Sequence, residues 1–561
     1  MNNCDDEIYR SITKKEIIKI FLVGGIIGAF IFVLCYGWKI LDVTYDSWLF
    51  TGSDITQHYI GWKFYRAADW TFPIGMMDNI LYPSTSCIIF TDSIPLFAIF
   101  FKLFSPILPE TFQYFGIWGI FSYFMMGALA AMIVRKSTKS QILCYMGSVI
   151  FAFSPYVAQR MFAHTALAGH WILLIGIFIW IYKPYFSTFK RKLLAWGIAL
   201  ITGSLIHIYF VPMILVLMFG FCLQDVFEKC DWKADLVIAP VCIIFDLIVL
   251  YVVGAFSTGG FSDGPGLGKY SANVNSLINS NNRTLLLNPL PILEGQDEGF
   301  GYLGLGIILV LAISLILIIN KYIKIKRQKN ILNQYKTEIS YAISMFVVVI
   351  IFLVLAWSPT IVLGERVLFT IEYPAFVLKI LNIFRASGRF MWPVSYLLMF
   401  FSIMSIVRYC SSRIQYGIIC GALLIQVIDM SSLTLNKQWI GNQPSQFVTI
   451  QDRLWEELAK DREHVIILPY STVRNLYGLT AWYEIGNFAV DHGMKVSSFP
   501  AARLDYDLLT ANDNLNAENT RNGSISKDSL YILDSVERGE ELGLEVFCID
   551  SYNVGVRKQY K

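Results

Sequence analysis

The chain has 561 residues, of which 55% are hydrophobic, 15% aromatic and only 16% charged. Soluble domains carry about 25% charged residues, so this composition excludes an ordinary soluble protein and indicates that lipid surrounds most of the chain. The formal net charge of +3 is small for this length. The basic residues lie mainly in short loops between apolar runs rather than in one patch, which argues against a nucleic-acid partner.

About eleven apolar runs are long enough to cross a hydrocarbon core, which takes roughly 20 residues. They occupy residues 18–38, 111–134, 141–158, 164–182, 193–207, 208–224, 235–256, 301–320, 338–357, 390–408 and 413–430. Because His207 and Pro212 punctuate one continuous stretch, the pair 193–207 and 208–224 could instead be a single bent helix. The first run has no clear small-residue cleavage site, so we interpret it as a retained helix.

The distribution of Lys and Arg predicts the orientation of these helices. If the N-terminus is cytoplasmic, every second loop is basic, as the positive-inside rule requires. This places residues 39–110, 256–300, 358–389 and everything after about 431 on the outer face. Within the first outer loop, Ser93–Leu108 is apolar but short, and we expect it to lie at the membrane interface. The prediction is therefore a multi-pass protein of the cell membrane with an extracytoplasmic C-terminal domain.

The composition changes after Asp429, where charged and amide residues return and apolar residues come in runs of strand length. The expected strands are Val465–Leu468, Lys495–Ser498, Ser529–Leu533 and Leu544–Ile549, and Gln451–Asp461 is expected to be an amphipathic helix. The predicted fold is mainly α. A polytopic helical bundle of residues 1–430, with a long first outer loop, precedes a small α/β or α+β domain of residues 431–561.

The first outer loop contains an acid that could do chemistry at the membrane surface. Asp54 lies a few residues beyond the first helix, where a carboxylate can meet both a lipid headgroup and an aqueous acceptor. Gln57 and His58 follow one turn later and would share a helical face with Asp54. Asp92 is a further candidate in this loop. The alternative interpretation is that these are ordinary polar loop residues.

Two other outer segments supply candidates. Arg160 and His164 lie in a turn too short to fold alone, so we expect them to face the same cavity as the first loop. Glu298 lies in the glycine-rich stretch Gln296–Gly304 of the loop 256–300. This loop could be a mobile segment that orders over a ligand or a plain flexible connection.

One ionisable residue lies in the middle of a predicted span. An acid at the depth of Asp246 is costly in a membrane and raises the question of a function. A single acid of this kind is more often structural, either protonated or bonded to His207.

Two arginines precede the tenth span and follow the amphipathic segment Pro374–Ile383. If the segment around them is helical, Arg385 and Arg389 are four residues apart and present two guanidinium groups on one face. Guanidinium groups bind phosphate in a bidentate manner, so this pair suits a phosphate or pyrophosphate. The alternative is that both arginines anchor a helix to lipid headgroups.

With these positions in view, the chain resembles the GT-C superfamily of membrane glycosyltransferases, in particular an uncharacterised bacterial family of that type. The resemblance covers nearly the whole length and rests on the order of its motifs: Gly52-Ser53-Asp54 with Gln57-His58, Thr91-Asp92-Ser93-Ile94-Pro95, Ala163-His164 through His170-Trp171, Gln296–Gly304, Arg385–Trp392 and a terminal soluble domain. It implies transfer at the outer membrane surface from a polyprenyl phosphate or pyrophosphate sugar donor. By the same resemblance, Asp54 would be the acid, and Arg385 or Arg389 would contact the donor phosphate.

The chain departs from oligosaccharyltransferases of that superfamily in its second outer loop. They carry an acidic metal-binding motif there, whereas this chain has Arg160 and His164 and no carboxylate. A divalent metal is therefore not favoured, and no other cofactor is expected. Without a metal, an acid can deprotonate the acceptor hydroxyl while cations stabilise the departing phosphate.

The expected function is transfer of a sugar from a polyprenyl phosphate donor to a cell-surface glycan or lipid acceptor. Two alternatives stay open: a transporter or flippase of lipid-linked sugars, and a non-catalytic assembly factor for surface polysaccharides. Transporters usually show inverted repeats and polar sites near the midplane. Here the polar candidates lie in outer loops and only Asp246 lies at depth, which favours the enzyme.

Overall fold

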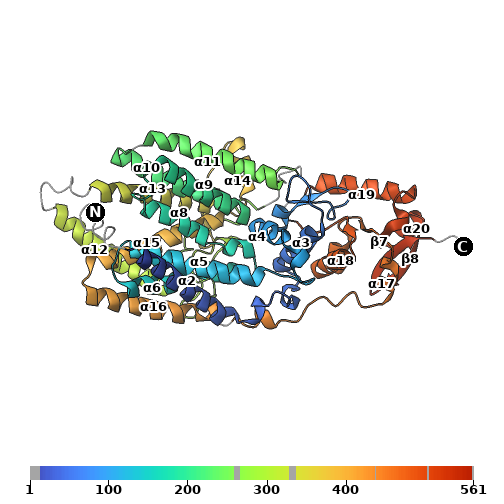
Figure 1. The fold of residues 1–561 in the computed structure, drawn as a ribbon, viewed down its shortest axis with the longest axis horizontal. Helices are drawn as coiled ribbons and strands as arrows, with labels where there is room; N and C mark the ends of the chain where they lie inside the picture. The colour runs from blue at the N-terminus through green and yellow to red at the C-terminus, as the bar shows by residue number, and fades with distance from the viewer. Residues whose placement is uncertain are drawn as a thin grey trace.

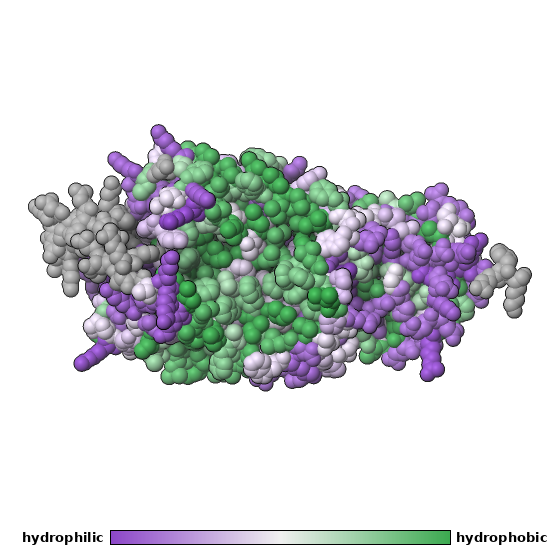
Figure 2. Space-filling view, in the orientation of Figure 1, coloured by the Kyte–Doolittle hydropathy of each residue, from purple (hydrophilic) through white to green (hydrophobic). Residues whose placement is uncertain are grey.

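The computed structural model describes residues 13–230, 232–257, 266–326, 336–435, 437–501 and 504–558. A long helical bundle fills one end of the molecule, and a smaller domain with a sheet fills the other (Figure 1). In Figure 2 a band of hydrophobic residues crosses the visible face of the bundle, and hydrophilic residues cover both its far end and the terminal domain. This band is the surface that a membrane protein presents to lipid.

Each apolar run expected from the sequence contains helix. The helices are α2 (Lys14–Tyr36), α5 (Phe115–Arg135), α6 (Gln141–Ala152), α7 (Pro155–Arg160), α8 (Trp171–Ile181), α9 (Phe189–Ile206), α10 (Phe210–Glu228), α11 (Trp232–Val253), α12 (Leu305–Lys326), α13 (Lys336–Trp357), α15 (Met391–Tyr409) and α16 (Ser412–Thr434). The described residues contain eight helical stretches long and apolar enough to cross a membrane, and Thr165–Ile181 and Leu305–Lys321 are shorter apolar helices. The structure therefore indicates a membrane protein, but the predicted count of eleven spans is not confirmed.

The helices α9 and α10 are separate, so the interpretation as one bent helix is wrong. His207 has an extended backbone at the end of α9, and its Nδ1 accepts a hydrogen bond from the amide of Tyr209 (3.2 Å). This local bond replaces the helical pattern between the two helices.

The outer loops predicted from the charge pattern share one end of the bundle. His164 Nδ1 lies 2.6 Å from Asp54 Oδ2, and Arg389 Nη2 lies 3.1 Å from Glu298 Oε2. Basic loops contact one another elsewhere: Arg135 pairs with Glu16 at 3.2 Å, and the Ser140 and Tyr416 hydroxyls lie 2.7 Å apart. The orientation of these loops relative to a membrane stays a prediction.

The outer loops contain short elements of their own. These are α3 (Asp54–Ala67), β1 (Met76–Met77), β2 (Ser86–Cys87), α4 (Pro95–Lys102), η5 (Thr165–Ala168), η6 (Gln296–Gly299), β3 (Thr360–Leu363), β4 (Arg366–Thr370), α14 (Ala375–Ile383) and η8 (Ser387–Phe390). The helix α4 is too short to span a membrane, and it and the turn after it expose Phe100, Leu103 and Ile107. This is the arrangement expected of a helix at the interface.

The terminal domain is built on a five-stranded mixed sheet of order β6-β5-β7-β9-β8. Its elements are α17 (Leu454–Ala459), β5 (His464–Leu468), α18 (Leu479–Asp491), β6 (Lys495–Val496), α19 (Tyr506–Arg521), β7 (Ser529–Leu533), α20 (Val536–Glu541), β8 (Leu544–Ile549) and β9 (Tyr552–Arg557). The four expected strands correspond to β5, β6, β7 and β8. The sequence analysis missed β9, α18 and α19, and the helix expected over Gln451–Asp461 is shorter than predicted.

The first outer loop extends the edge of this sheet. The amide of Val496 in β6 donates to the carbonyl of Asn79 (3.0 Å), and the amide of Tyr82 donates to the carbonyl of Val496 (2.9 Å). The terminal domain therefore packs directly on the loop that carries Asp54.

Candidate functional site

A cavity of about 630 Å³ at the outer-loop end brings together most of the residues singled out in the sequence. Its lining includes Asp54, Gln57, His58, Asp92, His164, Glu298, Arg385 and Arg389. The remaining candidate, Arg160, is not part of the lining but forms an ion pair with Glu298, which is. Segments hundreds of residues apart in the chain thus contribute to one site.

Asp54 is the first residue of α3, and the turn before it is held by hydrogen bonds. Thr56 Oγ1 accepts from the amides of Thr51 (3.0 Å) and Gly52 (3.1 Å) and donates to the carbonyl of Leu49 (2.7 Å). A carboxylate in the first turn of a helix is stabilised by the helix dipole. The Asp54 side chain keeps 47% of its surface exposed, so it is accessible from the cavity.

Asp54 and His164 form a close pair. His164 Nδ1 lies 2.6 Å from Asp54 Oδ2, and His164 Nε2 lies 3.7 Å from Glu298 Oε1. Burial alone would lower the pKa of His164, but the hydrogen bonds with Asp54 and Glu298 outweigh it and raise that pKa. Burial alone would raise the pKa of Asp54, but the hydrogen bond and charge of His164 hold it below its usual value. The pair therefore keeps Asp54 ionised near neutral pH.

His58 and Gln57 line the cavity one turn after Asp54, so the predicted shared helical face is present. His58 is only 2% exposed, and burial lowers its pKa to about 3, so its imidazole is neutral. Its Nδ1 is buried without a hydrogen-bond partner in the described part of the chain. A buried polar atom of this kind is usually satisfied by a water molecule or a ligand.

Glu298 is the anionic centre of the site. Its carboxylate accepts hydrogen bonds from Arg160 Nη1 (3.1 Å) and Nη2 (3.0 Å) and from Arg389 Nε (3.1 Å). Burial would raise the pKa of Glu298, but the charges of Arg389 and Arg160 and the hydrogen bond from His164 hold it far below its usual value. A carboxylate this stable in its charged form is poorly suited to proton transfer, so it positions its three cationic neighbours.

Buried amide side chains form hydrogen bonds within the loop that carries Glu298. Asn273 Nδ2 donates to Gln296 Oε1 (2.8 Å), which also accepts from the amide of Leu293 (3.1 Å). Further along, Asn279 Nδ2 donates to Asn275 Oδ1 (3.3 Å). Residues 258–265 of this loop lie outside the described residues. These bonds tie together the segments around residues 273–279 and 293–296, while most residues from 282 to 294 are exposed. That the loop orders over a ligand stays a prediction.

The two arginines before α15 have different environments. Arg385 lies between α14 and η8, so the expectation that it shares a helical face with Arg389 is wrong. Arg389 is engaged by Glu298, and its guanidinium lies 4.6 Å from the centre of the Tyr209 ring. Arg385 is exposed, lines the cavity and forms no hydrogen bond or ion pair with another described residue. Its guanidinium is therefore the more accessible one for a ligand anion.

A third histidine, His207, lines the cavity, and the sequence analysis missed it as a site residue. His207 Nε2 lies 3.6 Å from Asp92 Oδ1. Because His207 Nδ1 accepts from a backbone amide, a neutral ring carries its proton on Nε2, facing Asp92. Asp246 Oδ1 accepts a hydrogen bond from Ser204 Oγ (2.7 Å), and of the two alternatives for this acid, the bond with His207 is not found among the described residues. The signal for His207 was its position in the polar break between two apolar runs.

Apolar side chains form a wall of the cavity, and Asp246 of α11 lies in the lining among them. The wall is formed by Leu200, Ile208, Val211, Leu215, Ile243, Leu247, Leu250, Ile383 and Phe384, from α9, α10, α11, α14 and adjoining turns. Ile243 and Leu247 are also exposed on the outer surface of α11, and Phe376 and Ile380 are exposed on α14. The cavity lining therefore combines charged and apolar side chains, and it is amphipathic.

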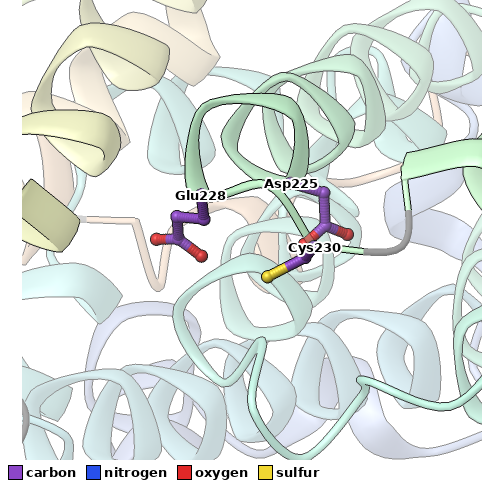
Figure 3. Close-up of side chains that lie close together, drawn as sticks. All are labelled: Asp225, Glu228 and Cys230. Atoms are coloured by element: carbon purple, nitrogen blue, oxygen red, sulfur yellow. The ribbon is translucent and has the colours of Figure 1, made fainter.

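A separate ionisable cluster lies at the ends of α10 and α11. Asp225, Glu228 and Cys230 approach one another closely enough to hold a metal ion, as Figure 3 shows. Lys183 Nζ, however, lies 2.7 Å from Asp225 Oδ1 and also pairs with Glu228, and Lys192 Nζ lies 2.6 Å from Asp225 Oδ2. The carboxylates are therefore already neutralised, and the cluster is an ion-pair network that joins α9 and α10 with the turn after α8.

The fold and the cavity define a membrane-type helical bundle with an amphipathic cavity bordered by an α/β domain. The chain belongs to the family described as a domain of unknown function, DUF6311, whose model matches residues 25–431. A second model, the DUF6311 C-terminal domain, matches residues 454–557. No curated protein matches the chain.

Proposed function

We propose that the protein is a membrane glycosyltransferase that moves a sugar from a polyprenyl-phosphate-linked donor to a surface glycan or lipid acceptor. The observation that carries this proposal is the amphipathic cavity, whose lining combines the Asp54 carboxylate and the accessible Arg385 guanidinium with many apolar side chains. A lipid phosphate likewise combines a charged headgroup with an apolar tail. The resemblance to GT-C glycosyltransferases supports the same reaction.

The donor would bind with its headgroup at the arginines and its tail along the apolar wall. Arg385 is accessible and offers a planar donor group that matches phosphate oxygens. The isoprenoid chain would lie against Ile243 and Leu247 of α11 and leave the cavity toward lipid. Burial of each CH₂ group of such a chain contributes about 0.8 kcal/mol.

Asp54 would act as the base. An acceptor hydroxyl bonds to the anomeric carbon through its oxygen while its proton passes to the Asp54 carboxylate. The bond between that carbon and the phosphate oxygen breaks, and its electron pair leaves with the phosphate. Arg385 and Arg389 face the charge that develops on the leaving group. His164 holds Asp54 in its charged form and fixes one of its oxygens.

The reaction would take place on the outer face of the membrane. The outer loops, the cavity and the terminal domain gather at one end, and the loops rich in Lys and Arg gather elsewhere. The positive-inside rule assigns the basic end to the cytoplasm, and hence the N-terminus also.

The test uses the purified full-length protein in lipid nanodiscs with a panel of undecaprenyl-phosphate sugars, and the readout is release of undecaprenyl phosphate. Asp54→Asn keeps the size of the side chain but removes the base, and we expect release to fall about 10²–10⁴-fold while lipid-phosphate binding is retained. The matched control is Asp69→Asn, an exposed acid of the same loop outside the cavity lining, which should leave turnover unchanged.

Two results would contradict the proposal in different ways. Near-normal turnover by Asp54→Asn would show that another group is the base. Undecaprenyl-phosphate binding and movement across vesicles without turnover of any donor would replace the enzyme with a transporter or flippase.

A further inference from the structure

The helix that begins with Asp54 is held between two parts of the chain. On one side α3 packs against the bundle and the first outer loop, where Trp62 Nε1 donates to the carbonyl of Phe112 (2.9 Å) and Ser93 Oγ donates to the carbonyl of His58 (2.6 Å). On the other side lies α18 of the terminal domain, and Figure 1 shows α3 between α4 and α18. Contacts with the bundle on one side and with the terminal domain on the other therefore fix the position of α3.

The contact with the terminal domain runs along α3. Lys63 Nζ donates to Asn487 Oδ1 (2.7 Å) and forms an ion pair with Asp491. The rings of Phe64 and Phe499 lie 5.6 Å apart. Beyond α3, Lys495 Nζ pairs with Asp78 Oδ2 at 2.6 Å. The terminal domain thus reaches residues of the first outer loop at several points.

The same domain encloses the turn before Asp54. Gly52 has φ +68°, and a Cβ at this position would overlap Thr480 Oγ1 of α18. Only glycine combines this backbone conformation with such a close approach. On the other flank of the turn, the rings of Phe50 and Phe447 lie 4.7 Å apart, and the amide of Gln446 donates to the carbonyl of Phe50 (2.8 Å).

The domain also reaches the site itself. Ala501, between β6 and α19, lines the cavity. Tyr483 of α18 is buried, and burial together with the nearby charge of Asp54 raises the pKa of its phenol. A domain that served only to bind a distant partner would not need to contribute to the cavity wall.

We propose that the terminal domain is a wall of the active site and that Thr480 and the other α18 residues facing α3 are positioning residues for Asp54. The proposal rests on the catalytic role proposed for Asp54. It assigns the domain a structural task in catalysis: to keep the Gly52 turn and the first residues of α3 in place beside the donor site.

The experiment weakens the docking without touching the cavity. Lys63→Glu with Lys495→Glu places like charges opposite Asp491 and Asp78 in the full-length protein. We expect hydrogen exchange in residues 50–58 to become about tenfold faster. Release of undecaprenyl phosphate from its sugar donors should fall at least about tenfold, because small misplacements of catalytic groups are costly. Binding of undecaprenyl phosphate should not change.

Two further variants separate positioning from a general loss of stability. Adding Asp491→Lys and Asp78→Lys restores both ion pairs with their charges exchanged, and both exchange and turnover should recover. The matched control is Lys460→Glu with Lys527→Glu, two exposed lysines of the same domain, and it should behave as the wild type.

Thr480→Trp provides a second way to separate α18 from the turn, by inserting a large side chain where Gly52 touches the helix. Wild-type exchange in residues 50–58 in both this variant and the charge-reversed variant would overturn the inference. Faster exchange with unchanged turnover would also overturn it. Hydrogen exchange is measured without substrate, so it tests the docking of the terminal domain even if the wild type has no turnover. The absence of turnover in the wild type would contradict the proposed function alone.

Discussion

Glu298 provides the sharpest test of how the site is held together. Glu298→Gln keeps the shape of the side chain but removes the charge that faces Arg160 and Arg389. The side chains of these arginines are only 5% and 12% exposed, so water cannot replace the lost carboxylate. Removing one partner of a buried ion pair typically costs about 3–5 kcal/mol. Because the amide oxygen still accepts one hydrogen bond, we expect a loss near the lower limit, about 3 kcal/mol.

The loss is measured as a change in the free energy of unfolding in detergent, by denaturant titration with the wild type alongside. A difference of about 3 kcal/mol changes the unfolding equilibrium by roughly two orders of magnitude. The matched control is Glu294→Gln, four residues earlier in the same loop. Its side chain is 89% exposed and pairs with Lys269 at the surface, so no measurable change is expected.

The same variant should change the titration of His164. Its pKa is raised because Asp54 and Glu298 together outweigh burial. A raised histidine pKa stabilises the folded state below the ordinary pKa near 6.5, and the contribution is lost as pH rises through the folded value. Removing Glu298 removes one of the two raising partners, so His164 should lose its proton at a lower pH. Diethyl pyrocarbonate, which modifies neutral imidazole, reports the midpoint by mass spectrometry across pH.

The reasoning about Glu298 would be refuted by a variant that unfolds like the wild type and keeps the wild-type midpoint for His164. A loss of stability in Glu294→Gln equal to that in Glu298→Gln would also refute it, because the effect would then belong to the loop rather than to the buried ion pairs.

Two further predictions concern the donor and the orientation. Arg385→Gln should weaken undecaprenyl-phosphate binding about 10–150-fold, the range expected for loss of a charge-assisted hydrogen bond, without changing stability. The control is Arg413→Gln, which changes an exposed arginine at the start of α16. Equal binding by both variants would return Arg385 to the role of a membrane anchor. A reporter active only in the cytoplasm and fused after Lys561 should be silent; an active fusion would place the terminal domain on the wrong side for the proposed reaction.

The sequence by itself determined the features that depend on local pattern. The length of the apolar runs predicted helices, because a helix needs only neighbouring residues to satisfy its backbone. Alternation of basic loops predicted an orientation in the membrane, which stays a prediction. The face shared by Asp54, Gln57 and His58 followed from helical spacing alone. The sites in these segments could therefore be named before any long-range contact was known.

Only the tertiary structure decided which of those residues pair with one another and which stay accessible to a ligand. In the sequence, Glu298 is one acid in a glycine-rich loop. In the structure it binds two arginines distant in the chain: Arg160, which lies 138 residues earlier, and Arg389, which lies 91 residues later. Arg385 and Arg389 look equivalent in the sequence, but only Arg389 meets that carboxylate. The docking of Thr480 on Gly52 is likewise invisible locally. Such contacts arise from the packing of elements far apart in the chain, and no periodicity or spacing within a segment encodes which distant partner a side chain will meet.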